Sequence, residues 1–271
     1  MDALSNRFFP NTACINIAVC HLIFNVNVLF CLCYLLAAHM NISITPLRLL
    51  STLIKIVCAL VFCAVVTRLL FHYYKSPLIE ELCYIFNLDE EHNIPALYSF
   101  FQLLAAAFLL ALIARHASKT KDRLRRYWWL MTILFFYVAF DELESFHERA
   151  GLLLHQHFHT SGFFYFAWVV PAVIILLILG IILLRFLVNL PVACRKRFLI
   201  AGTVYITGAV GGDVVAGEYI SMHGSGLGWP YVVEYHIEEA MEMLGIAYFI
   251  YALLLYIKDF TTQPVIFTIN E

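Results

Sequence analysis

The sequence predicts an all-α membrane protein, a polytopic transmembrane bundle of seven spanning helices. Of its 271 residues, 62% are apolar and 13% are charged, whereas soluble domains average about 45–50% apolar and about 25% charged residues. The mean hydropathy is +0.83, and the apolar runs continue for roughly 20 residues, the length at which a helix crosses a bilayer. Spanning strands would instead alternate apolar and polar residues. We therefore expect one integral membrane domain over residues 1–271, with its core at 50–257.

Seven apolar segments provide the expected helices. They are Cys14–Ala38, Leu50–Phe71, Pro95–Ala114, Tyr127–Glu148, Phe163–Leu187, Phe198–Ile220 and Val232–Ile257. The first differs from the others because it carries His21, Asn25 and Asn27 among its apolar residues. Met40 is an alternative start of the chain. If it is used, residues 1–40 add no spanning helix and six helices are expected.

Basic residues gather at alternate ends of these segments. They are Arg48, Arg115, Lys119, Lys121, Arg123, Arg125, Arg126, Arg185, Arg195, Lys196, Arg197 and Lys258. Because Lys and Arg are enriched in the cytoplasmic loops of membrane proteins, we expect these ends and the C-terminus to be cytoplasmic. The opposite side then receives residues 76–93, which are too polar to span and carry five acidic side chains.

Acidic residues recur at one depth on three of the expected helices. Counted from the cytoplasmic ends at 1.5 Å per residue, Asp141 and Asp213 lie roughly 22 Å up and Glu242 roughly 24 Å up. A charged group at this depth costs a few kcal/mol, and such residues usually serve a function. Gly208, Gly211, Gly212, Ala216 and Gly217 form a small-residue face on the sixth helix, which would let a neighbouring helix approach closely.

These carboxylates, together with nearby histidines, predict a divalent metal site. His147 follows Glu144 by three residues and His236 precedes Glu239 by three, a spacing at which carboxylate and imidazole share one helix face. Oxygen and imidazole ligands suit Zn, Mn or non-haem Fe. The candidate ligands are Asp141, Glu144, His147, Asp213, Glu238 and Glu242. The candidate supporting residues are Ser145, Glu148, Glu218, His236, Glu239, Gln102 and Arg68.

The same residues allow other interpretations. Acids at the outer ends of helices are often simply solvated by water among the lipid headgroups, and no cofactor is then needed. A cation or proton transporter would use the same acids, although the helices below Asp141, Asp213 and Glu242 are almost uniformly apolar. A sensor or scaffold without catalysis would need a separate output partner. The sequence leaves open whether the protein is an enzyme, and which protein partners it has.

Other features exclude some function classes. The basic loop Lys119–Arg126 is typical of a cytoplasmic anchor, and Tyr127, Trp128 and Trp129 are expected in an aromatic belt at the membrane interface. Nothing in the sequence therefore predicts nucleic-acid binding. The eight cysteines lack the CxxC pairing of metal sites and lie mostly in apolar stretches. The expected partners are the lipid bilayer and a lipid or small-molecule ligand.

Two segments resemble a family of uncharacterised bacterial multipass membrane proteins. The segment Leu88–Pro95 has the pattern LDxExNIP, and the segment Asp141–Glu148 has the pattern DExxSxHE. In addition, the last helix continues as Glu242–Gly245, a Glu-Met-x-Gly ending. The resemblance covers residues 50–257 and implies a location in the bacterial inner membrane and an important role for the acidic cluster. It implies no reaction.

A looser similarity connects the chain to intramembrane hydrolases of the alkaline ceramidase and adiponectin receptor type. Those proteins combine Ser, Asp and His ligands on several helices. A lipid-modifying metalloenzyme is the leading expectation for this chain because its acids converge at one depth on three helices. The chain departs from their pattern because it lacks Ser-x3-His on an early helix and His-x3-His on the last. No residue role is transferred from this similarity.

Overall fold

A computed structural model describes residues 45–224 and 228–260, which belong to one compact unit. The expected first helix, Cys14–Ala38, lies outside the described residues. Within them every regular element is helical and no strand occurs. The elements are α3 (Pro46–Tyr73), α4 (Pro77–Phe86), α5 (Ile94–Lys119), α6 (Arg125–Glu144), α7 (Phe146–Phe158), the 3-10 turn η1 (Gly162–Phe164), α8 (Val169–Asn189), α9 (Val192–Ile206), the π-helical segment η2 (Thr207–Gly212), α10 (Asp213–His223) and α11 (Trp229–Phe260).

Five helical segments in the described part are long and apolar enough to cross a membrane. They are α3, α5, α8, the continuous run Val192–His223 formed by α9, η2 and α10, and Trp229–Asp259 of α11. The helix α6 has 20 residues and would be about 30 Å long, but five of these residues are charged and sit at its two ends. Five of the seven expected spans are therefore shown within residues 45–224 and 228–260.

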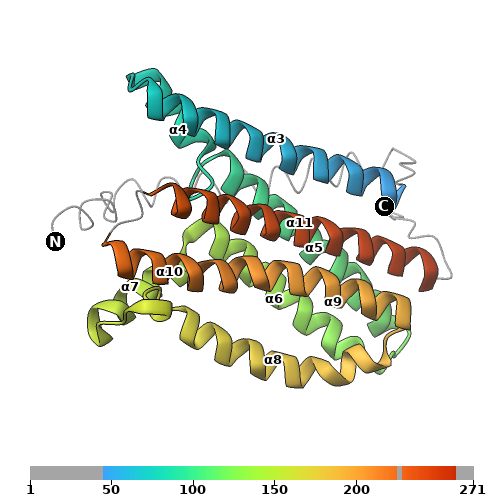
Figure 1. The fold of residues 1–271 in the computed structure, drawn as a ribbon. Helices are drawn as coiled ribbons and strands as arrows, with labels where there is room; N and C mark the ends of the chain where they lie inside the picture. Colours follow the sequence, from blue (N-terminus) through green and yellow to red (C-terminus); the bar gives the residue numbers. More distant parts are fainter. Residues whose placement is uncertain (1–44, 225–227, 261–271) are drawn as a thin grey trace, which may run out of the picture. The chain divides into compact units, whose positions relative to one another are not determined.

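The helix α11 is the centre of the bundle, because it contacts α3, α5, α9 and η2 (Figure 1). Its neighbour α5 forms a closely packed antiparallel pair with α6. Between them lies an apolar core whose innermost side chains, Leu110, Trp128 and Leu253, are 0% exposed. These three side chains lie in the half of the bundle nearest the basic helix ends, and the same core continues towards the other end through Phe100 and Leu143.

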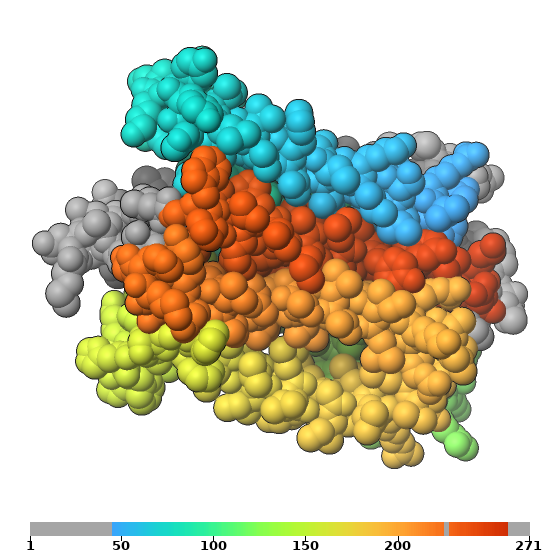
Figure 2. Space-filling model, viewed as in Figure 1, coloured from blue at the N-terminus to red at the C-terminus, as the bar shows by residue number. Residues whose placement is uncertain are grey.

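Much of the bundle surface is apolar. Ile174, Leu177 and Ile181 on α8 are 54%, 64% and 76% exposed, and α8 contributes only Val169 and Phe186 to the buried residues. Figure 2 shows α8 along one side of the bundle and α3 lying along α11 on the other. Apolar surface this extensive exceeds what soluble monomers expose and is typical of a membrane environment.

The two ends of the bundle differ in charge. The start of α3, the start of α9 and the end of α11 lie together at the right of Figure 1, and they carry Arg48, Arg195 and Lys258. The opposite end receives α4, α7, α10 and the start of α11. The acidic residues predicted to form a cluster all lie towards this second end, which we call the acidic end.

The segment 88–95 joins α4 to α5 through specific contacts. Leu88 is buried in a small apolar cluster with residues of α3 and α11. The Asn93 side chain caps α5 by accepting a hydrogen bond from Ala96 N–H (3.1 Å), and it donates to the carbonyl of Asn87 (2.6 Å). Pro95 follows in the first helical turn, where its missing N–H costs nothing. These contacts explain the pattern LDxExNIP as the start of a helix.

Three expectations about local structure were wrong. The segment Tyr127–Glu148 is not one helix, because it breaks at Ser145 into α6 and α7. Residues 163–168 are not part of α8, which begins at Val169 after a short turn. Trp128 is not in an aromatic belt: it is 0% exposed, whereas its neighbour Trp129 is 42% exposed. The membrane pattern of aromatic residues does not reveal which of two adjacent rings faces the core.

Candidate functional site

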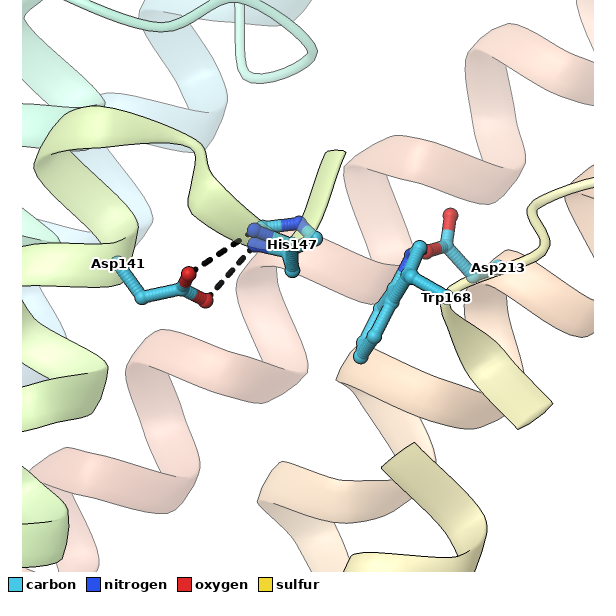
Figure 3. A network of polar contacts seen from close by, with 4 residues as sticks. All are labelled: Asp141, His147, Trp168 and Asp213. Carbon is cyan, nitrogen blue, oxygen red and sulfur yellow. Dashed lines mark hydrogen bonds and ion pairs between the residues drawn. The ribbon is translucent and has the colours of Figure 1, made fainter. Parts of the chain in front are cut away.

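Asp141 and His147 form the best-defined contact at the acidic end. The His147 Nδ1 atom lies 2.8 Å from Asp141 Oδ2, and the His147 backbone N–H donates to Asp141 Oδ1 at 3.0 Å (Figure 3). The carboxylate therefore binds both the ring and the backbone of one residue. This two-point contact fixes the imidazole and leaves its Nε2 atom directed away from the aspartate.

The break at Ser145 creates this contact. Ser145 adopts a left-handed conformation (φ 49°, ψ 44°), ends α6 and starts α7. In an uninterrupted helix, residues six apart would not meet on one face. The sharp turn instead brings the first turn of α7 back over Asp141, so the carboxylate accepts from a free N–H at a helix N-terminus, where negative charge is favoured.

His147 is connected to a second aspartate through Trp168. The imidazole and indole ring centroids are 4.6 Å apart, and the Trp168 indole N–H donates to Asp213 Oδ2 at 2.6 Å. Figure 3 shows the indole standing between His147 and Asp213. Because an imidazolium within about 6 Å of an indole face is attracted to it, this arrangement stabilises a positive charge on His147.

The protonated form of His147 is favoured by its surroundings. Burial lowers the pKa of His147, but the hydrogen bond and the negative charge of Asp141 outweigh burial and raise this pKa to about 9. Since the folded pKa exceeds the ordinary value of 6.5, the contact contributes its full stability below about pH 6.5. That stability is lost as the pH rises towards 9.

We expect Asp141→Asn to lower the pKa of His147 towards its ordinary value, because the substitution removes the negative charge. The measurement is the titration of the His147 ring by histidine-selective NMR in detergent micelles. Glu144→Gln is the matched control, because Glu144 contacts Arg149 (3.8 Å) rather than His147. An unchanged midpoint in Asp141→Asn would show that the Asp141 contact does not control the protonation of His147.

A second group of acids lies deeper, between α6 and α11. Glu142, Glu239 and Glu242 are partly buried and lie within electrostatic range of one another. Glu242 is also within range of Glu238 and Asp213. Like charges this close repel one another, so a proton or another cation must compensate part of their charge.

Glu142 and Glu242 line the same internal pocket. Ser99 and Gln102 of α5 and Tyr205 of α9 complete its polar lining. Ser99 is a near neighbour of Glu142, and Tyr205 is a near neighbour of Glu242. Gln102 is 4% exposed, and its Oε1 atom has no hydrogen-bond partner. An acceptor without a donor therefore faces the two carboxylates.

Close packing of the π-helical segment η2 positions the acids of α11. A Cβ atom on Gly208 would lie 2.9 Å from the Glu238 carbonyl oxygen, and one on Gly212 would lie 2.5 Å from Glu238 Cδ. The glycines therefore let η2 approach α11 as the sequence pattern predicted. The π-helical segment ends at Gly212, and α10 begins at the next residue, Asp213. Single π-helical turns are rare and often occur at functional sites.

The remaining predicted residues lie apart from this pocket. Glu144 contacts the exposed Arg149 and not His147. Glu148 is exposed, and Glu218 Oε2 lies beside Gly162. The His236 Nδ1 atom binds the Val232 carbonyl (2.6 Å). Two further predicted supporting residues also have other neighbours. Arg68 is in electrostatic range of His236, and Ser145 is a near neighbour of Glu91.

Glu91 links the α4–α5 connection to the acidic end. It is partly buried, and its Oε2 atom has no hydrogen-bond partner. Burial and the charges of Glu142 and Glu148 raise the pKa of Glu91 to about 8. This carboxyl is therefore largely protonated at neutral pH and adds little to the negative charge.

The two expected carboxylate–imidazole pairs do not form. The break at Ser145 turns His147 towards Asp141 instead of Glu144, and the ring nitrogens of His236 do not contact Glu239. Across residues 45–224 and 228–260, no three His, Cys, Asp or Glu side chains are arranged to hold a metal ion together. The arrangement thus separates an Asp–His pair at the rim from the inner carboxylates.

A family model described as a domain of unknown function (DUF8692) matches residues 53–257. The chain belongs to this family. The match runs from α3 to α11 and contains both segments whose patterns resembled a bacterial membrane protein family. No curated protein and no solved structure matches the chain. No relationship to the ceramidases or adiponectin receptors is therefore shown, and the DUF8692 description assigns no activity.

Sequence reasoning missed four residues of the DUF8692 region that belong to the site. Glu142 and Ser99 line the pocket, Tyr205 is the neighbour of Glu242, and Trp168 bridges His147 and Asp213. Ser99 lies three residues before Gln102, so their shared helix face could have indicated it. Trp168 lies in an irregular connection, where helical spacing predicts nothing.

Proposed function

We propose that this chain is an integral membrane protein that binds a divalent cation among the carboxylates of its acidic end. The supporting observation is that Glu142, Glu239 and Glu242 lie within electrostatic range of one another, and that Glu142 and Glu242 line one pocket with the unpartnered Gln102 amide oxygen. Partly buried anions repel one another and lose hydration. A cation bound among them offsets both the repulsion and the lost hydration, so a bound cation would stabilise the group.

The geometry favours some of the predicted ligands over others. Asp141 and His147 bind each other, and Glu144 contacts Arg149. Of the predicted ligands, Glu242 lines the internal pocket, where Glu142 and the side chains of Ser99, Gln102 and Tyr205 add further oxygen atoms. Of the predicted metals Zn, Mn and Fe, a mainly carboxylate set best suits Mn.

We further propose seven spanning helices. The helix α6 is the sixth span, because its charged residues lie at its two ends and leave an apolar middle. Residues 14–38 form the seventh. The basic helix ends and the C-terminus then lie in the cytoplasm, and the acidic end lies on the outer side of a bacterial inner membrane.

The activity we propose is a metal-dependent reaction on a lipid or a small molecule at the outer membrane surface. A bound divalent metal would act as a Lewis acid and stabilise negative charge that develops in the reaction. His147 is the proton donor, because Asp141 and Trp168 favour its protonated form and its Nε2 atom is directed away from Asp141. Transport is not proposed, because the apolar core around Leu110, Trp128 and Leu253 closes the bundle below the acids.

Thermal unfolding tests the cation proposal. A ligand present at 100 times its Kd stabilises a protein by about 2.7 kcal/mol, so MnCl2 added to chelator-treated protein should raise the Tm. Adding the metal should not change the Tm of the triple variant Asp213→Asn, Glu238→Gln, Glu242→Gln. A wild-type Tm that responds to none of Mn, Zn or Fe would contradict the proposal.

A further inference from the structure

The pocket between α5, α6, α9 and α11 differs from the rest of the acidic end in its chemistry. The polar groups that line it are carboxylates, hydroxyls and one amide. They belong to Glu142, Glu242, Ser99, Tyr205 and Gln102. Neither histidine nor cysteine lines it. Oxygen sets of this kind select Mg, Ca or Mn over Zn.

Charge balance indicates what the pocket accepts. Two ionised carboxylates carry two negative charges, which one divalent cation neutralises. The Gln102 amide nitrogen donates to the Tyr98 hydroxyl at 3.2 Å, which fixes the amide and leaves the Oε1 atom without a donor. Because buried acceptors are nearly always satisfied, the unpartnered oxygen points to a cationic or proton-bearing occupant.

The small size of the pocket limits which cation can occupy it. Leu103, Met243 and Ile246 close it on the apolar side, and the space is too small for a water molecule. An occupant must therefore shed its water and take its ligands from the protein. Mg²⁺ dehydrates reluctantly and usually keeps several waters, so Mn²⁺ fits better.

We infer that Glu142, Glu242 and Gln102 form an inner site for one dehydrated divalent cation of the Mn²⁺ class, held by oxygen atoms alone. This inference rests on the proposed function and assigns the cation to a defined place. Ser99 and Tyr205 act as positioning residues, because they line the pocket beside the two carboxylates. Asp141, His147 and Trp168 stay outside this inner site.

Electron paramagnetic resonance (EPR) of Mn²⁺ tests the inference on the full chain in detergent. Wild-type protein should bind about one equivalent. Both Glu142→Gln and Glu242→Gln should weaken binding by at least about 100-fold, the upper range seen when supporting residues of metal sites are removed. Gln102→Met should weaken binding less, because one neutral ligand is lost. Glu144→Gln is the control and should bind like wild type.

Pulsed EPR of the bound ion adds a readout that is independent of affinity and of folding defects. An oxygen-only site shows no nitrogen coupling, whereas an imidazole ligand would show one. A clear nitrogen coupling, or full Mn²⁺ binding by a folded Glu142→Gln variant, would overturn the inner site while leaving the proposed function in place. A wild-type protein that binds no divalent metal would overturn both and assign protons to the two carboxyls.

Discussion

Trp128→Ala is expected to lower the free energy of unfolding by about 3–5 kcal/mol, the range for large-to-small changes at buried aromatic residues. Trp128 is 0% exposed. Its ring centroid lies 4.8 Å from that of Phe186 on α8 and 4.8 Å from that of Tyr256 on α11. One side chain thus joins α6 to two other helices, and its removal leaves a cavity that these helices cannot easily fill.

Trp129→Ala is the matched control for this prediction. Trp129 is 42% exposed and donates its indole N–H to the Ser118 hydroxyl at 3.1 Å, so its loss should cost far less. Trp128→Phe should also be mild, because the Trp128 indole N–H has no hydrogen-bond partner and phenylalanine removes that unsatisfied donor. Both proteins would be unfolded thermally in the same detergent. Equal losses at positions 128 and 129 would contradict the described core.

Gly245→Ala and Gly208→Ala are expected to destabilise the bundle by about 1–3 kcal/mol each, the usual cost of overpacking. A Cβ atom at Gly245 would lie 2.8 Å from the Tyr205 backbone nitrogen, and one at Gly208 would lie 2.9 Å from the Glu238 carbonyl oxygen. Backbone atoms cannot rotate away as side chains do. The helices α9, η2 and α11 must therefore separate, which also displaces the inner carboxylates.

Gly202→Ala is the control in the same helix pair. No atom lies within 4 Å of a Cβ atom at Gly202, and alanine is the better helix former by about 1 kcal/mol. Its Tm should stay the same or rise. Weakened cation binding in Gly208→Ala, with unchanged binding in Gly202→Ala, would connect helix packing to the site. If all three alanine variants unfold like wild type, the close approach of η2 and α11 is wrong.

The sequence was sufficient for the fold class and for most of the spanning helices. Long continuous apolar runs have few other solutions, because a helix in lipid must satisfy its backbone internally. This held for α3, α5 and α11, whose ends differ from expectation by a few residues. It also held for the glycines of η2, whose spacing predicted a close helix contact.

The local geometry of the site could not be predicted in this way. The segment Asp141–Glu148 contains no glycine or proline, yet Ser145 adopts a left-handed conformation that costs roughly 1–2 kcal/mol outside glycine. The contacts of Asp141 with the ring and backbone of His147 favour this turn, and helical spacing does not reveal them. Helical spacing placed His147 beside Glu144, whereas the turn places it on Asp141. The π-helical turn Thr207–Gly212 likewise has no marker in the sequence beyond its glycines.

The depth argument identified the acidic end but not the arrangement of its side chains. The depth of Glu142 at the end of a helix does not distinguish it from a solvated acid, yet it lines the same pocket as Glu242. Adjacent residues on a helix point about 100° apart, so Asp141 and Glu142 serve different parts of the site. Only packing decides which of them faces inward.

The central claim is that the acidic end binds a divalent cation, and the most direct test is the metal content of the purified protein. Mass spectrometry of full-length protein in detergent should find about one equivalent of Mn, Zn or Fe in wild type and in Glu144→Gln. Glu242→Gln should retain little of it. A folded, homogeneous wild-type protein that contains no divalent metal, and takes up none when supplied, would contradict the claim.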